Sequence, residues 1–311
     1  PSWSGQMASL KEVNVFLRGG LGNQLFQYST GLAISQRYGK KLILRTDLLP
    51  LYEDEIGGIS RWPNQISAFR HSGTIRSSGN QPAGRTNATG KLMQLLRTMG
   101  DLNSQILIKM GWLSAENIIA KRPSDLDSVN YVNSYSPYKD LAVENRTQLS
   151  NELNNIVEPT AQFLKLSTEI MEKPTTVVHI RQGDYLNLQS IFGTLTAGYL
   201  SQAIGKLDLT SKSQRVWLFT DSPNRLQDSF LSILRPERII GPADLGRPIE
   251  NLVLMSKGTA IVAANSTFSW WACFIANDST AVIAPNILNA KLNNFASENE
   301  PLGHWEFINL N

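Results

Sequence analysis

The second half of the chain repeats one pattern, in which a short apolar segment runs into a polar loop and then into a stretch with helical spacing. The apolar segments predict strands at residues 176–180, 216–220, 238–240, 260–264 and 281–284. Strands that alternate with helices form a parallel sheet, because a helix carries the chain back to the start of the next strand. The pattern therefore predicts a doubly wound α/β domain whose ligand lies beyond the carboxyl ends of its strands.

The first half of the chain opens with the same pattern. Residues 13–17 predict a buried strand, and a glycine-rich turn over residues 18–22 leads into a helix that ends at Gly39. Residues 41–45 predict the next strand. Strand, turn, helix and strand form one unit of a second parallel sheet.

The segments between these two patterns are less regular. Residues 60–90 are rich in Gly, Ser, Asn, Pro and Thr and predict a long surface loop. Residues 91–113 have helical spacing, which suits a core helix or a helix on a membrane surface. One helix is predicted over residues 145–170, and we expect a domain boundary after it, between residues 7–170 and 171–311.

The composition excludes several classes of protein. A chain of 311 residues with 41% hydrophobic and 18% charged residues is long enough and apolar enough for two cores. The net charge of +3 is spread over scattered Lys and Arg residues, so a nucleic-acid partner is not expected. The one cysteine, Cys273, has no disulfide or metal partner, and we expect a buried, inert thiol.

The sequence predicts no membrane-spanning helix, because no stretch approaches the roughly 18 apolar residues that one requires. Residues 1–6 precede Met7 and have no pattern that ties them to the fold, so we expect them to be foreign to the natural sequence. These features predict a cytoplasmic protein. Its mildly basic composition also suits peripheral contact with an acidic lipid leaflet or with anionic substrates.

Three polar segments at strand ends are the candidates for chemistry. The first, RGGLGNQLFQ at residues 18–27, places clustered glycines before a helix whose unpaired N–H groups attract anions. It lacks the glycine spacing of dinucleotide-binding turns and of the P-loop. A plain tight turn explains the segment about equally well.

The second segment, HIRQGDY at residues 179–185, follows the first predicted strand of the second domain. Arg181 leaves the sheet at its carboxyl end, where a guanidinium grips two phosphate oxygens at once. Asp184 would orient that arginine or contact a sugar. The alternative is a structural ion pair between Arg181 and Asp184.

The third segment, ANSTFSWWA at residues 264–272, carries a strand into a helix. Its Asn, Ser and Thr residues are good helix caps, and the helix dipole with the first N–H groups forms an anion site. A cap alone is the alternative explanation. Two adjacent tryptophans cannot share one helix face, so we expect one of Trp270 and Trp271 in the core and the other along a cleft.

Together, the order and separation of the three segments resemble glycosyltransferase family 11, the alpha-1,2-fucosyltransferases, in its bacterial branch. That family carries GGLGNQxFQY, HxRRxDY and NSTFSWW, which read here as Gly19 to Tyr28, His179 to Tyr185 and Asn265 to Trp271. The linking sequence fits from about Val13 to Asn286. The resemblance implies the GT-B type of fold, two Rossmann-like domains with the active site in the cleft between them.

The resemblance also assigns site residues. Arg181 matches the arginine that contacts the donor's β-phosphate, and His179 and Asp184 match the positions that flank it. Residues expected to bind the donor elsewhere are Ser266, Thr267 and Phe268 at the diphosphate and nucleoside, and Gly20, Gly22 and Asn23 in a loop that faces the fucose and phosphate.

Two positions depart from the family pattern. Gln182 stands where the family has a second arginine, which removes one positive charge but spares Arg181. Asn251 stands where the family usually has an aspartate that pairs with guanine, so the base preference rests on an amide instead of a carboxylate. Glu250 is adjacent but points differently on a helix.

The implied reaction is an inverting transfer of fucose from GDP-fucose to the 2-hydroxyl of a galactose in a glycan or glycolipid, at the inner face of the bacterial plasma membrane. Arg181 and the helix that begins near Ser266 would stabilise the departing diphosphate in place of a metal ion. The sequence Asp125-Leu126-Asp127 follows no apolar strand, so we expect a solvated turn there and no metal or other cofactor.

The catalytic residues expected are Arg181, Asp184 as the first candidate for the base, and Asn23 as a group that orients sugar or acceptor. Asp221, after the strand at 216–220, faces the cleft or caps a helix. Two alternatives stay open: the same fold with another nucleotide-sugar donor, and a protein that binds a sugar nucleotide without catalysis. The family expectation places the product in lipopolysaccharide or capsule assembly.

Overall fold

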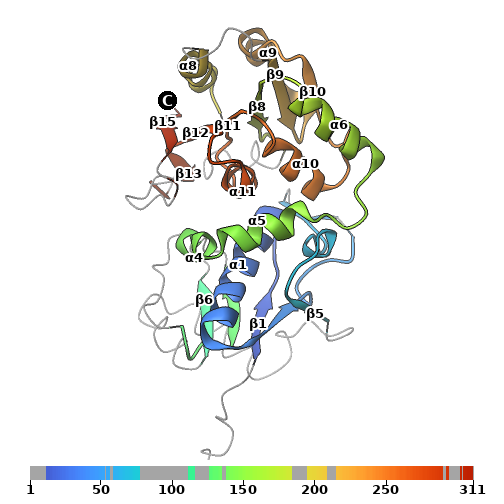
Figure 1. The fold of residues 1–311 in the computed structure, drawn as a ribbon, viewed down its shortest axis with the longest axis vertical. Coiled ribbons are helices and arrows are strands. Elements are labelled where there is room, and N and C mark those ends of the chain that lie inside the picture. The colour runs from blue at the N-terminus through green and yellow to red at the C-terminus, as the bar shows by residue number, and fades with distance from the viewer. Residues whose placement is uncertain are drawn as a thin grey trace, which may run out of the picture. The chain divides into compact units, whose positions relative to one another are not determined.

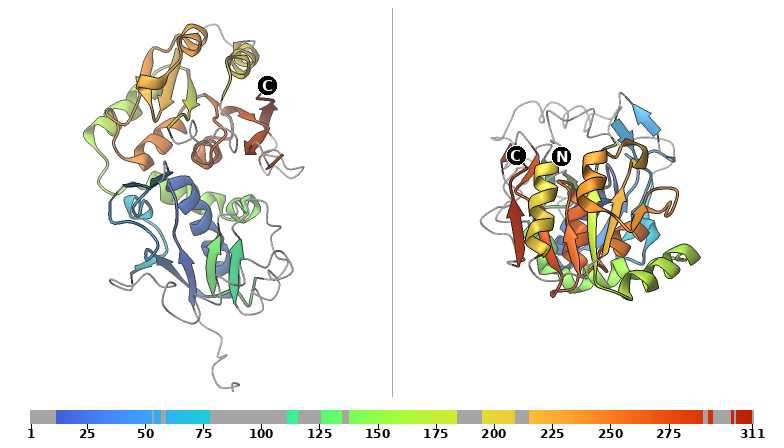
Figure 2. Two further views of the ribbon diagram at one scale, coloured as in Figure 1. Left: turned by 180° about the vertical axis from the view of Figure 1, so that it is seen from behind. Right: turned by 90° about the horizontal axis from the view of Figure 1, so that it is seen from above.

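The structure is a computed structural model of the 311-residue chain. It describes residues 12–52, 54–56, 59–77, 111–115, 126–134, 138–183, 195–208, 215–289, 292–293, 302 and 304–310. The chain divides into two compact units, shown in Figures 1 and 2. The first unit comprises Pro1–Asp54, Arg61–Ile66 and His71–Asn145, and the second comprises Glu55–Ser60, Ser67–Arg70 and Arg146–Asn311.

The first unit is built on a five-stranded sheet in the order β5-β2-β1-β7-β6, with every neighbouring pair parallel. Helix α1 lies against β1, β2 and β7 and packs on α4. The elements are β1 (Glu12–Phe16), α1 (Leu21–Tyr38), β2 (Lys41–Arg45), β5 (Thr74–Arg76), β6 (Trp112–Ala115), β7 (Tyr131–Ser134) and α4 (Lys139–Glu144). The strands predicted at residues 13–17 and 41–45 and the helix end at Gly39 are confirmed.

The second unit is built on a six-stranded sheet in the order β10-β9-β8-β11-β12-β15, again with every pair parallel. Renumbered along the chain this order is 3-2-1-4-5-6, that of a doubly wound nucleotide-binding domain. Its elements are α5 (Arg146–Asn154), α6 (Ala161–Met171), β8 (Thr175–Ile180), α8 (Ala197–Asp208), β9 (Arg215–Thr220), η4 (Pro223–Arg225), α9 (Asp228–Leu234), β10 (Arg238–Ile240), α10 (Pro248–Met255), β11 (Ala260–Val262), α11 (Thr267–Ile275), β12 (Ala281–Pro285) and β15 (Trp305–Ile308).

Four short strands form two-stranded pairs outside these sheets, β3 (Asp54–Ile56) with β4 (Ile59–Arg61) and β13 (Ile287–Asn289) with β14 (Leu292–Asn293). The 3-10 turn η2 (Ile66–Ala68) spans one of the points where the chain passes between the two units, because Ile66 belongs to the first unit and Ser67 to the second. The five strands predicted for the second half are confirmed as β8 to β12. The expected α/β fold with two Rossmann-like sheets, the GT-B type, is therefore confirmed.

Helices cover both faces of the second sheet. Helices α8 and α9 pack on each other, and α8 contacts β11, β12 and β15. Val178 and Ile180 of β8 enter this core together with side chains of both helices. Helices α10 and α11 pack on each other and on α5, and α10 also contacts α6. The view from above in Figure 2 shows α8 and α9 running along the strands. Because side chains alternate along a strand, His179 lies on the face opposite to Val178 and Ile180.

The helix predicted over residues 145–170 is two helices, α5 and α6. Glu158 has a left-handed backbone with φ 48°, and Pro159 follows it, so no helix can continue through this link. The division between the units falls at residue 145, so both helices belong to the second unit, and the predicted boundary after residue 170 lies later than this division.

A buried carboxylate anchors this link to the rest of the second unit. Glu250 on α10 is fully buried and accepts hydrogen bonds from the backbone N–H and the hydroxyl of Thr160, both at 2.8 Å. Arg247 donates to Glu250 at 3.1 Å and to the carbonyl oxygens of Val157 and Glu158 at 2.9 and 2.8 Å. Glu250 therefore has a structural role, and its partners differ from those of the adjacent Asn251, as its different direction on the helix predicts.

Two further predictions in the first unit need correction. The surface loop predicted over residues 60–90 contains β5, an edge strand of the sheet; residues 78–90 lie outside the described part of the chain. The helix predicted over 91–113 lies mostly outside it as well, and its described end is the start of strand β6. Whether residues 91–110 pack in a core or on a membrane stays untested.

Within the described ranges, none of the helices has the length and hydropathy that crossing a bilayer requires. Cys273 is buried, as expected, and burial raises the pKa of its thiol far above the ordinary range. A thiol held neutral in this way is a poor nucleophile.

Candidate functional site

The candidate site lies at the carboxyl edge of the second sheet. Strand β8 sits between β9 and β11, with Ile180 opposite Thr220 and Val178 opposite Val262. The strand order reverses direction at this place, because β9 and β10 lie on one side of β8 and β11 and β12 on the other. Such switch points are where doubly wound sheets bind their ligands. The loops that follow β8, β9 and β11 therefore begin side by side.

Arg181 is the first residue after β8 and is held by Asp221, the first residue after β9. The Nε of Arg181 lies 3.1 Å from Oδ2 of Asp221, and both side chains are 21% exposed. A guanidinium carries five N–H donors, and this contact uses one of them while fixing the plane of the group. The arginine is thus paired with Asp221 at the carboxyl edge of the sheet.

The same carboxylate holds the backbone of the β8 loop. Oδ1 of Asp221 accepts the N–H of Gln182 at 2.9 Å, and its two oxygens lie 3.2 and 3.1 Å from the N of Gly183. A Cβ at Gly183 would lie only 2.7 Å from Oδ2, so glycine is required for this close approach. Asp221 therefore fixes three consecutive residues after β8.

Asp221 answers one of the questions left by the sequence. The first residue before η4 is Ser222, so Asp221 is not a helix cap but an acceptor for the β8 loop. Asp184, the carboxylate predicted to orient Arg181 or to pair with it, lies outside the described residues, and its role as a base stays a prediction. The sequence indicates Asp221 as a residue at a strand end but carries no signal for its partners in the β8 loop.

Gln182, the first departure from the family pattern, is only 4% exposed. Its contribution to the loop described above is the backbone N–H that Asp221 accepts. Because a backbone N–H does not depend on the side chain, this part of the loop geometry survives the exchange of arginine for glutamine.

The third polar segment forms the start of α11. Ser266 is the N-cap, and its hydroxyl accepts the N–H of Ser269 at 3.1 Å, so the predicted cap is confirmed. Thr267 and Phe268, in the first turn, are half-buried, whereas Asn265 and Ser266 are buried. The first N–H groups of a helix carry positive partial charge, and this end of α11 lies at the carboxyl edge beside β8. A cap and an anion site are compatible here.

His179 lies on β8, two residues before Arg181, and is 5% exposed. Its Nδ1 is 2.5 Å from the hydroxyl oxygen of Ser269, and its ring packs on Phe268 with 5.6 Å between the ring centroids. Burial lowers the pKa of His179 to about 4, with nearby Asp221 opposing and Arg181 assisting the shift. The imidazole is therefore neutral at pH 7 and contributes hydrogen bonds rather than charge.

Both tryptophans of the third segment are buried, which contradicts the expectation that one lines a cleft. Trp270 is 1% exposed and stacks on Phe274 at 4.8 Å between centroids, while Trp271 is fully buried and meets Phe274 edge-on. Residues 269–275 are all buried, and α11 packs on both α5 and α10. A helix without a solvent face places both adjacent aromatic rings in the interior.

Asn251, the second departure from the family pattern, uses its amide to bind its own backbone. Its Nδ2 donates to the carbonyl oxygen of Leu245 at 2.7 Å and to that of Arg247 at 3.2 Å. Only a donor fits two carbonyl oxygens, which fixes the orientation of the amide. Asn251 lies in the first half of α10, the helix that leaves the carboxyl end of β10. The Oδ1 atom faces away from these carbonyls.

Replacing Asn251 with aspartate, the usual family residue, is expected to lower the free energy of unfolding by about 1–2 kcal/mol. The carboxylate loses two hydrogen bonds and meets two carbonyl oxygens instead. Urea unfolding of the two proteins measures the difference. Asn154→Asp is the matched control, because that exposed amide donates to one carbonyl oxygen, of Ser150 at 2.8 Å, and should cost less. Equal losses at the two positions would contradict this assignment.

The glycine-rich segment lies at the corresponding edge of the first unit, after β1. Gly19 has φ 71°, a conformation that only glycine adopts readily, and Gly20 is the N-cap of α1. Gly22 and Asn23 lie in the first turn of that helix, buried and half-buried respectively. The segment is thus both a tight turn and a helix start. The predicted roles of Gly20, Gly22 and Asn23 at the donor stay predictions.

Buried glutamines hold the glycine-rich turn. Gln27 accepts the N–H of Arg18 at 2.8 Å, and Gln24 donates to the carbonyl oxygen of Gly19 at 2.7 Å. Gln24 also accepts the N–H of Gln65 at 2.9 Å, which ties the turn to a second loop of the same unit. Arg18 in turn donates to Asn133, at the end of β7, at 3.2 Å. The sequence placed these glutamines in a motif without revealing that they have a structural role.

No group of three or more potential metal ligands is found among the described residues. Asp127, from the sequence Asp125-Leu126-Asp127, is exposed and lies in a turn, and Asp125 lies outside the described residues. The expected solvated turn is therefore seen at Asp127.

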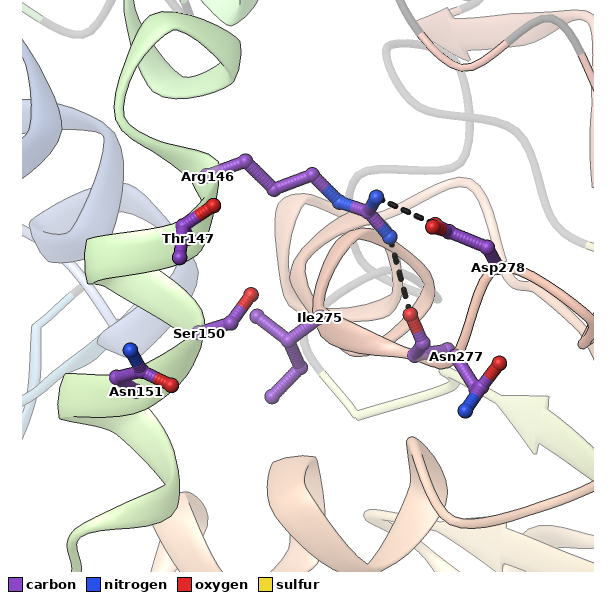
Figure 3. A pocket seen from close by; sticks show the side chains of 8 residues that line it. Arg146, Thr147, Ser150, Asn151, Ile275, Asn277 and Asp278 are labelled. Carbon is purple, nitrogen blue, oxygen red and sulfur yellow. Dashed lines mark hydrogen bonds and ion pairs between the residues drawn. The ribbon is translucent and has the colours of Figure 1, made fainter.

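A pocket in the second unit lies at the other end of α11. It has a volume of about 300 Å³ and is lined by Arg146, Thr147, Ser150, Asn151, Ile275, Ala276, Asn277 and Asp278 (Figure 3). Arg146 donates to the carbonyl oxygens of Phe274 and Ala276 at 3.0 and 3.1 Å and pairs with Asp278 at 2.5 Å. Its guanidinium thus satisfies carbonyl groups at the end of a helix. The pocket is separate from the carboxyl edge.

Comparisons with known proteins agree with the motifs. Residues 112–309, more than half of the chain, match the family model described as Glycosyl transferase family 11. The O-antigen biosynthesis glycosyltransferase WbnK of Escherichia coli is 26% identical over 132 residues, which are 41% of this chain and 42% of that relative. The match therefore spans less than half the length of the curated relative.

Similar chain paths occur in solved fucosyltransferase structures. NodZ from Bradyrhizobium matches with a TM-score of 0.47 and 15% identity over 85% of this chain and 92% of that chain. POFUT1 in complex with GDP-fucose matches with a TM-score of 0.47 and 14% identity over 85% of this chain and 94% of that chain.

Proposed function

The chain belongs to glycosyl transferase family 11, and we propose that it transfers L-fucose from GDP-fucose to the 2-hydroxyl of a galactose in a glycan acceptor. The observation that carries the proposal is the placement of Arg181 beside the start of α11 at the switch point of the second sheet. An arginine and a helix N-terminus are both groups that bind phosphate oxygens. The diphosphate of a nucleotide sugar is an anion that these two groups at the carboxyl edge of the second sheet could bind.

The proposed reaction is an inverting displacement. The acceptor oxygen forms a bond to the anomeric carbon of fucose as the bond from that carbon to the β-phosphate oxygen breaks. The acceptor proton goes to a base, for which Asp184 is the first candidate, and the bonding electrons leave with GDP. Negative charge on the diphosphate increases in the transition state, and Arg181 with the first N–H groups of α11 would stabilise it.

We propose that this stabilisation operates without a divalent cation. Arg181 is held by Asp221 in a fixed orientation, with its Nε 3.1 Å from the carboxylate, so its charge is in place before the donor binds. A preorganised cation and a helix dipole together supply the kind of charge that a metal ion supplies in other transferases.

The proposed acceptor rests on the similarity to WbnK and not on the residues of the candidate site. WbnK is named for O-antigen biosynthesis, and we propose that the acceptor here is likewise a galactose-containing glycan of a bacterial surface polysaccharide. Such a reaction takes place on the cytoplasmic side, where peripheral contact with the membrane would bring a lipid-linked acceptor within reach.

Asn251 favours, as a second candidate, a nucleotide-sugar donor other than GDP-fucose. The amide is committed through its N–H groups to two carbonyl oxygens, so it can offer guanine only its Oδ1 acceptor. A neutral acceptor discriminates between bases less strongly than a carboxylate does. A different nucleotide-sugar donor on the same fold is therefore the alternative that this residue favours.

A donor screen in EDTA tests the proposal. GDP-fucose, GDP-mannose and UDP-sugars are offered with a panel of β-galactosides, and the released nucleoside diphosphate and the product are measured. We expect GDP release from GDP-fucose that depends on the acceptor and persists in EDTA, with an α-1,2-linked product by NMR.

Three outcomes would contradict parts of this proposal. Turnover of another donor in preference to GDP-fucose would support the alternative donor. Activity that is lost in EDTA and restored by magnesium or manganese would refute the metal-free mechanism. Donor binding without turnover across the whole panel would favour a protein that binds the nucleotide sugar without catalysis.

A further inference from the structure

Ser269 links His179 to the start of α11 although it is itself fully buried. Its hydroxyl oxygen lies 2.5 Å from Nδ1 of His179, accepts the backbone N–H of Ala264 at 3.1 Å and accepts the hydroxyl of Ser266 at 3.3 Å. Its own N–H donates to the Ser266 hydroxyl at 3.1 Å. Three segments, β8, the end of β11 and α11, thus meet at one oxygen atom.

The direction of the contact with His179 follows from counting donors and acceptors. A serine hydroxyl has one hydrogen and two lone pairs. The N–H of Ala264 can only donate, and it takes one lone pair, while the Ser266 hydroxyl takes the other. With the Ser266 hydroxyl as the donor to Ser269, the hydrogen of Ser269 remains for Nδ1 of His179, which then accepts it.

An accepting Nδ1 decides where the proton of the neutral ring lies. Burial lowers the pKa of His179 to about 4, so the ring carries one proton at neutral pH. When Nδ1 is the acceptor, that proton is on Nε2. The Nε2 atom lies on the side of the ring away from Ser269 and, within the described part of the chain, makes no hydrogen bond.

We propose that Ser269 is a positioning residue that holds His179 in the Nε2–H tautomer, so that the imidazole donates a hydrogen bond to an oxygen of the nucleotide-sugar donor. The proposal rests on the proposed function, because it needs a donor at this edge. His179 on β8 and Arg181, the first residue after β8, are two residues apart at this edge. With the other tautomer, Nε2 would present a lone pair to a phosphate oxygen of the donor and repel it.

The tautomer is measured directly on the unliganded protein. The chain has three histidines, so ¹⁵N-labelled histidine gives three imidazole patterns in two-bond ¹H–¹⁵N spectra. Single substitutions of His71 and His304 with glutamine assign the third pattern to His179. We expect a neutral ring with the proton on Nε2 and a hydrogen-bonded Nδ1. A proton on Nδ1, or a charged ring at neutral pH, would overturn the proposal without reference to activity.

The variant Ser269→Ala tests the positioning role. We expect the Nδ1 resonance to lose its hydrogen-bond shift, a population with the proton on Nδ1 to appear, and turnover of GDP-fucose to fall about tenfold, the effect of one hydrogen bond. Ser256→Ala is the matched control, because it removes a buried hydroxyl of the same unit that donates to Val253 at 2.8 Å. The control should leave the spectrum of His179 and the turnover unchanged.

The outcomes separate this proposal from the proposed function. An unchanged His179 spectrum in Ser269→Ala, or an equal fall in turnover in Ser256→Ala, would refute the role of Ser269. A wild-type protein with the Nε2–H tautomer that turns over none of the donors would refute the proposed function and leave the assignment of the tautomer standing. If Ser269→Ala does not fold, the wild-type tautomer still decides the assignment.

Discussion

Turnover of GDP-fucose is expected to fall about a hundredfold or more when Arg181 is replaced with alanine. Loss of one preorganised group that stabilises transition-state charge costs on the order of 2.7–4 kcal/mol. Arg181 meets that description, because Asp221 holds its guanidinium at the ligand edge before any donor arrives. The measurement is kcat and kcat/KM for acceptor-dependent GDP release. We expect the loss mainly in kcat, since the interaction strengthens as charge develops on the diphosphate.

Two further variants sharpen this prediction. Arg181→Lys keeps the charge but loses the planar fork, so we expect activity between that of the wild type and that of the alanine variant. Arg37→Ala is the control, because it removes an equal charge from a surface ion pair with Glu144. If Arg181→Ala retained more than about a tenth of wild-type turnover, Arg181 would not be the main stabiliser of the leaving group.

Replacing Asp221 with alanine is expected to lower both stability and turnover. The change leaves the N–H groups of Gln182 and Gly183 without their acceptor and frees the Nε of Arg181. Gln182 is almost fully buried, so the free energy of unfolding should fall by about 2–3 kcal/mol. Turnover should fall at least tenfold because Arg181 loses its fixed orientation. Urea unfolding and the GDP-release assay measure the two effects.

A second aspartate–arginine ion pair serves as a control that distinguishes the loss of Arg181 orientation from the mere loss of an aspartate charge. Asp278→Ala also removes an aspartate that pairs with an arginine, Arg146, but at a side chain that is 78% exposed. That variant should leave stability and turnover nearly unchanged. If Asp221 acts through Arg181, the losses from Asp221→Ala and Arg181→Ala should not add in the double variant. Additive losses would show that Asp221 acts independently of Arg181.

The strands of the second unit were predictable because each is a short apolar run next to a polar loop. Strand β8 is buried at all six positions, and such a run leaves a clear signal. Strand β5 left none, because all three of its residues are exposed at the edge of the sheet. Pro159 is a sequence signal for the break between α5 and α6, because a proline interrupts a helix. The helical apolar spacing on both sides of Pro159 nevertheless predicted one continuous helix.

The part of the candidate site that could be predicted is the part formed by residues at the ends of strands. Arg181 and Ser266 both stand at strand ends, and the doubly wound order makes β8 the neighbour of β9, which implies that Arg181 lies beside Asp221. The contact of Ser269 with His179 has no such signal, because it depends on the rotation of α11 against β8. The same rotation placed both Trp270 and Trp271 in the interior, contrary to the prediction.

Helix α11 is secured at both ends, by the Ser266 cap and by the guanidinium of Arg146 on its last carbonyl groups. If a diphosphate binds at its first turn, as proposed, it meets a rigid receptor, and little of the interaction energy is spent on ordering the helix. Arg146 also places a cation at the negative end of the helix dipole, a local interaction that favours the helical state of the last turn of α11. The rigidity of the proposed phosphate-binding turn therefore rests in part on Arg146, which contacts the opposite end of the same helix.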